Sequence, residues 1–248
     1  MFKNIKDKRV LITGASGGIG SCMVLLFAEH QAIVGVHYHH GKEEAENLVR
    51  QVEKNRGRAV SFQADLVRDA GDILVRSFVD RFGGIDILIN NAGAVFGSKG
   101  ILELDGVSWE NTFRLNTQAP FFLAQGAFRF MKDNGGGKII NISSISAKYG
   151  GSDKTLHYGA SKAALEALSV GLARAGAPHN ILVNTVRGGF IDTPLHKKLG
   201  RTNLEKRIQA ILLKRAGKAE DIARMVLFLA SEGGDFITGE TFTVAGGD

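Results

Sequence analysis

Near its start the chain reads Val10-Leu11-Ile12-Thr13-Gly14-Ala15-Ser16-Gly17-Gly18-Ile19-Gly20. The first four residues predict a short buried strand, and the glycines after it allow a tight turn and a close approach of the backbone to a ligand. A helix predicted over residues 21–30 would direct free N–H groups and a positive dipole end at a phosphate. The spacing is G-x-x-x-G-x-G and no lysine follows the last glycine, which excludes a nucleoside-triphosphate P-loop. The stretch predicts a phosphate cradle or a purely structural turn.

The same residues also spell G-x-S-x-G around Ser16, which is the nucleophile-elbow pattern of α/β-hydrolases. Such an elbow needs several strands and an oxyanion loop upstream, and only one predicted strand precedes Ser16. The hydrolase interpretation is therefore a minor alternative.

Short runs rich in β-branched residues alternate with amphipathic stretches along the whole chain. We interpret the runs as strands buried on both faces, at residues 10–13, 32–36, 59–62, 85–90, 138–142, 181–186 and 241–244. The predicted helices cover residues 21–30, 43–54, 69–82, 109–132, 158–175 and 219–231. This alternation predicts an α/β fold, with right-handed crossovers between parallel strands. We expect a single Rossmann-type domain over residues 1–248, with a doubly wound parallel sheet of about seven strands and helices on both faces.

The composition restricts partners and location. Apolar residues are 44% and charged residues 23% of the chain, as in an ordinary globular protein. The net charge of +6 favours an acidic partner or serves solubility alone, and without a basic stripe interleaved with aromatics we expect no nucleic acid. No apolar run approaches the ~18 residues of a membrane helix, so we expect no membrane association and a cytoplasmic location. A single cysteine, Cys22, excludes an intramolecular disulfide.

Tyr158 and Lys162 lie four residues apart and therefore share one face of a predicted helix. A lysine charge held beside a phenol favours the phenolate and lowers the pKa of the phenol. A free tyrosine titrates near ~10, so work near pH 7 requires about 4 kcal/mol of differential stabilisation. Upstream, the predicted strand 138–142 leads into two hydroxyls, Ser143 and Ser144. Taken alone, the Tyr158–Lys162 pair is equally consistent with a chance surface pairing.

Several spaced motifs together resemble the short-chain dehydrogenase/reductase family from end to end. They are Thr13-Gly14-Ala15-Ser16-Gly17-Gly18-Ile19-Gly20, Asn90-Asn91-Ala92-Gly93, the series Asn116, Ser144, Tyr158 and Lys162, the segment from Val183-Asn184 to Thr193-Pro194, and the closing Thr238-Gly239 and Ala245-Gly246-Gly247. Within that family the chain looks most like the 3-oxoacyl-(acyl-carrier-protein) reductases.

The resemblance implies transfer of a hydride between a nicotinamide cofactor and a carbonyl or alcohol substrate. Tyr158 would be the general acid or base, Lys162 would bind the ribose and lower the tyrosine pKa, Ser144 would bond the substrate oxygen and Asn116 would hold a relay water. No metal is expected, and three nearby histidines (His37, His39, His40) are a weak metal pattern. The cofactor contacts implied in addition to Tyr158 and Lys162 are Gly14, Ser16, Gly18, Ile19, Gly20, Tyr38, His39, His40, Asp65, Leu66, Asn91, Ala92, Gly93, Gly189, Ile191 and Thr193.

The chain departs from the family pattern in two places. Gly188 stands where relatives usually have a proline, and the segment from Ser144 to Tyr158 is one residue longer. Ser144 is therefore our choice for the catalytic serine, with Ser143 and Ser146 as alternatives.

The predicted helix 109–132 contains Pro120, four residues after Asn116. Proline has no N–H and its ring crowds the carbonyl four residues earlier, so the Asn116 carbonyl would lose its usual partner in a continuous helix. The stretch predicts a kinked helix with a water site, or a simple interruption of the helix.

The end of the second predicted strand decides between the two nicotinamide cofactors. NAD-binding relatives carry an acidic residue there, about 20 residues past the glycines. Here the stretch reads Val36-His37-Tyr38-His39-His40-Gly41-Lys42, with no acid before Glu43. NADP is therefore favoured, with NAD as the alternative, although Gly17 replaces the arginine that NADP-binding relatives often carry in the turn.

Substrate and partners follow from the resemblance alone. A 3-oxoacyl thioester, delivered by an acidic acyl-carrier protein to Arg129, Arg174 and a basic substrate lid at about residues 194–214, is one reading. Sugar, polyol and steroid dehydrogenases share the same motifs and are the alternative, and a non-catalytic NADP-binding regulator is a third reading. Relatives are mostly tetramers or dimers, and the apolar face of Leu165, Leu168 and Leu172 predicts a homo-oligomer or burial against the sheet.

Overall fold

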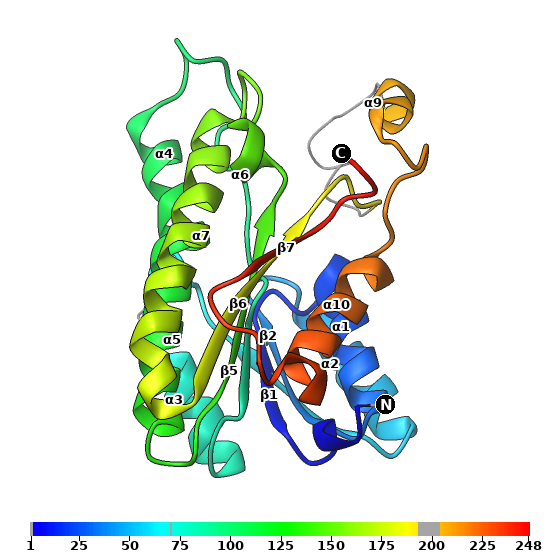
Figure 1. Cartoon of the computed structure of the whole chain (residues 1–248), viewed down its shortest axis with the longest axis vertical. Helices are drawn as coiled ribbons and strands as arrows, with labels where there is room; N and C mark the ends of the chain where they lie inside the picture. Colours follow the sequence, from blue (N-terminus) through cyan, green and yellow to red (C-terminus); the bar gives the residue numbers. More distant parts are fainter. Residues whose placement is uncertain (1, 70, 193–203) are drawn as a thin grey trace.

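The computed structural model describes residues 2–69, 71–192 and 204–248 (Figure 1). Its centre is a seven-stranded sheet in the order β3-β2-β1-β4-β5-β6-β7, and every neighbouring pair is parallel. The predicted α/β fold and parallel sheet are confirmed. The strands are β1 (Arg9–Ile12), β2 (Ile33–Tyr38), β3 (Arg58–Gln63), β4 (Ile87–Asn90), β5 (Gly137–Ser144), β6 (Ile181–Gly188) and β7 (Thr241–Val244).

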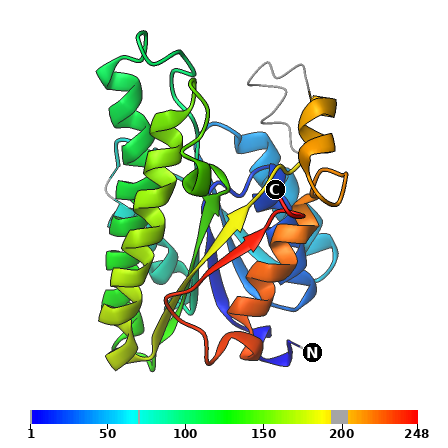
Figure 2. The same ribbon diagram turned by 45° about the horizontal axis from the view of Figure 1, so that its top comes forward.

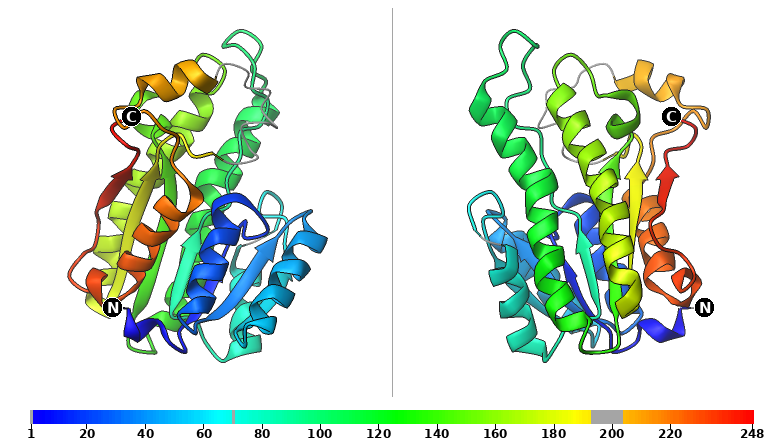
Figure 3. Two further views of the ribbon diagram at one scale, coloured as in Figure 1. Left: turned by 90° about the vertical axis from the view of Figure 1, so that its right-hand side faces the viewer. Right: turned by 60° about the vertical axis from the view of Figure 1, so that its left-hand side comes forward.

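Helices cover both faces of the sheet, as Figures 1 and 3 show. One layer holds α1 (Gly18–Glu29), α2 (Lys42–Lys54) and α10 (Ala219–Ala230), and the other holds α3 (Gly71–Phe82), α5 (Ala119–Met131) and α7 (Leu156–Gly176). The alternation of side chains along a strand produces the two layers. In β1, Val10 and Ile12 belong to the core beneath α1 and α10, whereas Leu11 packs into the core beneath α3 and α5.

The edge strands correct the expectation that every strand is buried on both faces. β3 and β7 each have one neighbour only and their side chains are mostly half-buried. The central strands β1 and β4 are fully covered, because helices lie on both of their faces. Hydrophobic β-branched residues thus predict a strand here, but they do not predict whether it lies at the centre or at the edge of the sheet.

The helix predicted over residues 109–132 is three elements. α4 (Gly106–Phe113) leads into the π-helical turn η2 (Arg114–Gln118), and α5 follows, with Pro120 as its second residue. The missing N–H of Pro120 is thus placed in the first turn of α5, where an N–H would have no partner within that helix. The backbone stays right-handed helical at the junctions between these elements, so of the two predicted alternatives the structure shows a distorted helix, with a π turn that contains Asn116.

The remaining elements are short: η1 (Lys3–Ile5), α6 (Ser146–Tyr149), η3 (Ala177–His179), α9 (Leu204–Ala210) and η4 (Glu232–Gly234). Of the predicted lid, residues 194–203 lie outside the described part of the chain. α9 and the residues after it pack near the C-terminus, where the Leu213 N–H donates to the Gly246 carbonyl at 3.0 Å. Figure 2 shows α9 beyond the carboxyl ends of the strands.

The order of the strands reverses between β1 and β4, which makes this the topological switch point of the sheet. From β1 the chain runs outward to β2 and β3, and then returns to β4 on the other side of β1. Ligands of open α/β sheets bind beyond the carboxyl ends of the strands at such a point. Among the described residues, none of the helices is both long and apolar enough to cross a membrane.

Candidate active site

The glycine turn connects β1 to α1 at this point of the sheet. Gly14 has a φ of +59°, and a Cβ there would lie 2.8 Å from Ala92 Cα. A Cβ on Gly20 would lie 2.3 Å from the Gly14 carbonyl oxygen, so both positions require glycine. α1 begins at Gly18 without a side-chain cap on its first N–H groups. Those N–H groups are suited to a phosphate, as the sequence predicted.

The end of β4 holds this turn from one side. Thr13 Oγ1 accepts the N–H groups of Asn91 and Ala92, each at 3.0 Å. The Asn91 side-chain amide donates to the Thr13 and Gly14 carbonyls at 2.9 and 3.0 Å. Asn91 thus supports the glycine turn with its side chain. Gly93 follows two residues later.

His37 of β2 holds the turn from the other side, a role that the sequence analysis missed. His37 is 2% exposed, and its Nδ1 accepts the Gly14 N–H at 3.0 Å. Its Nε2 lies 3.2 Å from the Ala64 carbonyl, so the ring is the neutral tautomer that donates from Nε2. Burial, which the Ala64 hydrogen bond opposes, lowers the His37 pKa to about 4. With both nitrogens engaged, His37 is not available as a metal ligand.

Acidification should therefore destabilise the protein through His37. Between pH 6.5 and 4 the unfolded chain binds a proton that folded His37 does not, so the free energy of unfolding falls as pH falls. The loss from this group amounts to roughly 3 kcal/mol and is complete below pH 4. Urea unfolding at several pH values measures it. His37→Gln should lose this pH dependence, whereas His179→Gln, on exposed η3, should keep it, and equal slopes in all three proteins would contradict the assignment.

The predicted adenosine-side residues gather at the ends of β2 and β3. Tyr38 is buried in the core, while His39 and His40 are exposed with ring centroids 3.5 Å apart. His39 Nε2 lies 3.5 Å from a carboxylate oxygen of Asp65. Leu66 is a core side chain, so its contact with a ligand is restricted to the backbone.

Ser16, a further predicted cofactor residue, lies close to the start of α2. A Cβ on Gly41 would lie 2.9 Å from Ser16 Oγ, so the turn and the start of α2 are in contact. Ser16 and the β2 end thus belong to one continuous surface, as the predicted cofactor contacts require.

Lys162 lies at the centre of the predicted catalytic group. It is 3% exposed, and its Nζ donates to the Ile142 carbonyl of β5 at 2.8 Å. The Nζ is 5.9 Å from the centroid of the Tyr158 ring, one helical turn earlier on α7. Burial lowers the Lys162 pKa to about 8, and the carboxylate of Glu166 opposes that shift. A lysine with a pKa near neutrality, next to a tyrosine, is a typical feature of an active site.

Gly93 separates Lys162 from Asn116. A Cβ on Gly93 would lie 3.0 Å from both Lys162 Nζ and Asn116 Oδ1, so any side chain there would push the two groups apart. Asn116 is fully buried: its Oδ1 accepts the Ala94 N–H at 3.0 Å, and its Nδ2 donates to the Ala94 carbonyl at 2.8 Å and to Ser161 Oγ at 3.1 Å. The structure therefore brings together three elements that are far apart in the chain.

The three serines considered for catalysis have different surroundings. Ser143 Oγ donates to Glu166 at 2.7 Å and lies beneath α7. Ser144 is the next residue of β5 and points to the other side, because side chains alternate along a strand. Its Oγ accepts the Ser146 N–H at 3.1 Å, which leaves the hydroxyl proton for a further acceptor. Ser144 therefore suits a donor to a ligand better than Ser143, whose proton goes to Glu166.

The last predicted cofactor residues follow β6. The Gly189 N–H donates to the Val244 carbonyl at 3.0 Å, which extends the pairing with β7. Ile191 is buried and bridges to Gly217. Gly188, which stands where relatives usually have a proline, is the last residue of β6 and pairs with Ser144 of β5 and Val244 of β7. Thr193 lies outside the described residues.

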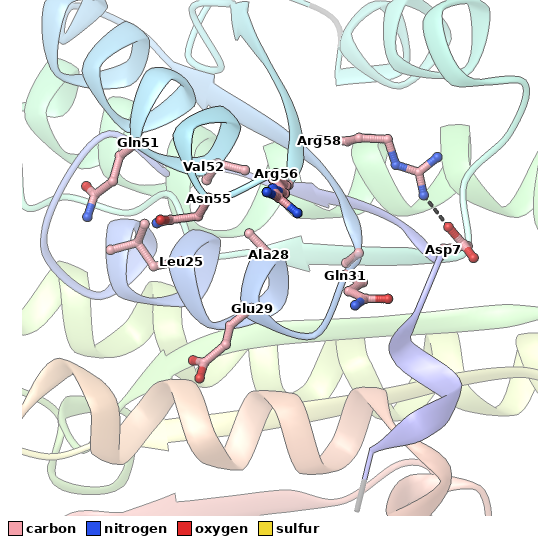
Figure 4. Close-up of a pocket in the computed structure, with 12 residues that line it drawn as sticks. Asp7, Leu25, Ala28, Glu29, Gln31, Gln51, Val52, Asn55, Arg56 and Arg58 are labelled. Carbon is pink, nitrogen blue, oxygen red and sulfur yellow. Dashed lines mark hydrogen bonds and ion pairs between the residues drawn. The ribbon is translucent and has the colours of Figure 1, made fainter.

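Two hollows lie away from this group. Figure 4 shows one of about 720 Å³ at the opposite end of the sheet, between the C-terminal ends of α1 and α2, with the Arg58–Asp7 ion pair at its rim. The other is an apolar groove over α4, α5 and α7, lined by Phe113, Phe121, Phe122 and Leu168 among others. Leu165 and Leu172 are buried within the chain, so only Leu168 of the predicted apolar face contributes to this groove.

A family model described as enoyl-(acyl carrier protein) reductase matches residues 14–248. The chain belongs to the short-chain dehydrogenase/reductase family. It is 34% identical to the 3-oxoacyl-[acyl-carrier-protein] reductase of Thermotoga maritima, over 98% of both chains. This short-chain dehydrogenase/reductase is therefore an oxidoreductase.

Solved structures of other family members have the same fold. A blue fluorescent protein from a metagenomic library, in complex with NADPH, is 33% identical, with a TM-score of 0.91 over 98% of both chains. A short-chain dehydrogenase from Burkholderia cenocepacia, in complex with NADP, is 31% identical, with a TM-score of 0.91 and the same coverage. The Rossmann-type architecture of this short-chain dehydrogenase/reductase is thus confirmed.

Proposed function

We propose that the protein reduces the ketone of a 3-oxoacyl thioester with NADPH. The observation that carries the proposal is the buried Lys162, held at the end of β5 by the Ile142 carbonyl and beside Tyr158. Burial of an ammonium group costs desolvation free energy, so such groups are rare outside functional sites. A buried ammonium beside a tyrosine, where the order of the strands reverses, suits proton transfer. The similarity to 3-oxoacyl-[acyl-carrier-protein] reductase supports the choice of substrate.

The residues present fit a dinucleotide. The two glycines that a Cβ would obstruct, Gly14 and Gly20, shape the turn, and the uncapped first turn of α1 offers N–H groups to the pyrophosphate. Asp65 and the backbone of Leu66 would contact the adenine, and Gly93, Gly189 and Ile191 would border the nicotinamide. The nicotinamide, when bound, supplies the hydride.

The side chains would then handle the substrate oxygen and its proton. Ser144 donates a hydrogen bond to the carbonyl oxygen, whose negative charge grows during reduction. Tyr158 gives its phenolic proton to that oxygen, and Lys162 binds the ribose and stabilises the phenolate that remains. Asn116 and its π turn would position the water that returns a proton to this group.

Turnover of acetoacetyl-CoA, followed by loss of NADPH absorbance, tests the substrate. Turnover supports the 3-oxoacyl assignment. NADPH binding without turnover of this thioester would overturn the assignment in favour of sugar, polyol or steroid substrates, and binding of neither cofactor would overturn the oxidoreductase role of the site.

We expect NADPH to bind more tightly than NADH. His39, His40 and Lys42 can bind a 2′-phosphate, and residues 36–42 at the end of β2 include no acidic residue that would repel it. His39→Asp should weaken NADPH binding about tenfold or more by repulsion between carboxylate and phosphate, and should leave NADH binding at least as tight, because a carboxylate there can accept a hydrogen bond from the ribose hydroxyl. Titration by nicotinamide fluorescence measures both. His179→Asp makes the same charge change on exposed η3 and should alter neither affinity. Tighter binding of NADH to the unmodified protein would contradict the preference.

Assembly and docking are part of the same proposal. The exposed apolar groove over α4, α5 and α7, where Phe122 is 36% exposed, would be covered in a homodimer or tetramer. We propose further that the chain is a single domain with a basic substrate lid at about residues 194–214. An acidic acyl-carrier protein would dock near Arg129 and Arg174.

A further inference from the structure

A row of polar side chains crosses three strands beneath α7. Ser143 of β5, Arg187 of β6 and Thr243 of β7 are register partners. Glu166 of α7 closes over the row and accepts from Arg187 Nε and Nη2 at 2.9 and 2.5 Å and from Ser143 Oγ at 2.7 Å. Arg187 Nη1 donates to Thr243 Oγ1 at 3.0 Å. The ion pair between Arg187 and Glu166 is thus bidentate, and hydrogen bonds to Ser143 and Thr243 hold it at either end.

This network lies directly behind the predicted catalytic group. Glu166 follows Lys162 by one helical turn, so the two side chains share a face of α7. Ser143 lies between Ile142, whose carbonyl accepts Lys162 Nζ, and Ser144. α7 is therefore tied to β5 at two successive turns, once through Lys162 and once through Glu166.

Stability alone does not explain an ion pair at this position. The Arg187 and Glu166 side chains are only 20% and 15% exposed, and desolvation of such a pair offsets most of its attraction. Apolar residues of similar volume are often equally stable there. The Glu166 carboxylate also opposes the effect of burial on the Lys162 pKa. The charge of Glu166 therefore favours the protonated form of Lys162.

We propose that Glu166, held by Arg187 and Ser143, is a positioning residue that ties α7 to β5 one turn after Lys162 and so keeps the Lys162 ammonium charged and in its place beside Tyr158. This inference rests on the proposed function of Lys162. In the described part of the chain, the Tyr158 ring centroid lies 5.9 Å from Lys162 Nζ, and Glu166 stands one turn further along α7 with Arg187 of β6 behind it. The surrounding loop after β4, the π turn and β5 contribute the uncharged Gly93, Asn116 and Ile142.

Direct titration of Lys162 tests the proposal without any need for turnover. In protein labelled with ¹³C-lysine, the signal that is absent from Lys162→Met reports Lys162. Glu166→Gln keeps the shape of the side chain and removes its charge, so the titration midpoint should fall by about one pH unit. Arg187→Met leaves the Glu166 charge uncompensated, so the midpoint should rise. Asp7→Asn, which removes the exposed Asp7–Arg58 pair at the far end of the sheet, should not move it.

Midpoints that stay unchanged, or that move in the same direction in both variants, would overturn the proposal. Thermal unfolding first shows that each variant is folded. Arg187→Lys keeps the positive charge and should keep the midpoint of the unmodified protein, and if Arg187→Met does not fold, the fall expected in Glu166→Gln decides alone. The alkaline limb of the kcat–pH profile should move with the midpoint. Opposite midpoint shifts in a protein that reduces no ketone would refute the proposed function alone, whereas ketone reduction with fixed midpoints would refute this inference alone.

Discussion

Phenylalanine at position 158 should lower kcat for ketone reduction by a factor of about 10²–10⁴, the usual contribution of a positioned general acid. The substitution removes only the phenolic hydroxyl, so the proton for the substrate oxygen has to come from water. The ring remains, half-buried one turn before Lys162, and α7 keeps its packing. The affinity for NADPH should therefore change by less than about threefold. Steady-state kinetics and cofactor fluorescence measure the two quantities.

Tyr149→Phe is the matched control. Tyr149 lies on α6, is 58% exposed, and its hydroxyl accepts from Lys148 Nζ at 3.1 Å. Removal of that hydroxyl should leave kcat unchanged. Near-normal turnover in Tyr158→Phe, with the control equally active, would refute the acid role of Tyr158. Equal losses in the two variants would indicate a general effect of tyrosine hydroxyls near this end of the sheet.

Methionine at position 162 should lower kcat by a factor of at least about 10² and change how stability depends on pH. Burial lowers the Lys162 pKa from 10.5 to about 8. Between these values the unfolded chain binds a proton that folded Lys162 does not, so the free energy of unfolding of the unmodified protein rises with pH across this window. The rise from this group is roughly 3 kcal/mol and is absent from Lys162→Met.

Urea unfolding between pH 7 and 10.5 measures the difference between the two proteins. Lys132→Met, which replaces an exposed lysine that follows α5, should lose neither the rise in stability nor the activity. A constant difference in stability between Lys162→Met and the unmodified protein would contradict the buried charge. Retained turnover in Lys162→Met would contradict the role of Lys162 in the reaction.

The sheet could be predicted because its signal is local. A strand that helices cover on both faces is mostly apolar, so runs such as Ile139-Ile140 indicate a strand from composition alone. The same logic fails at the edges, since Thr241–Val244 has the residues of a covered strand and only one neighbour. Composition shows which residues favour a strand, whereas the topology of the sheet decides whether helices and neighbouring strands cover it.

The order of the motifs likewise predicts where the candidate site residues gather. Tyr158 and Lys162 share a helix face because of their spacing, and the glycines of the first turn have to lie where β1 ends. Parallel strands bring their carboxyl ends to one edge of the sheet, so residues that follow β1, β4 and β5 had to meet there.

By itself, the sequence determined the parallel α/β sheet and the glycine turn after β1, and it predicted the residues that line this turn, because each depends on neighbours within a few positions. Only the tertiary structure decided that His37 holds Gly14, that Ser143 turns away from the site to Glu166, and that Arg187 completes that pair. These contacts join residues about 20 positions or more apart in the sequence, and they depend on strand register and on the depth of burial. Neither quantity can be read from local spacing.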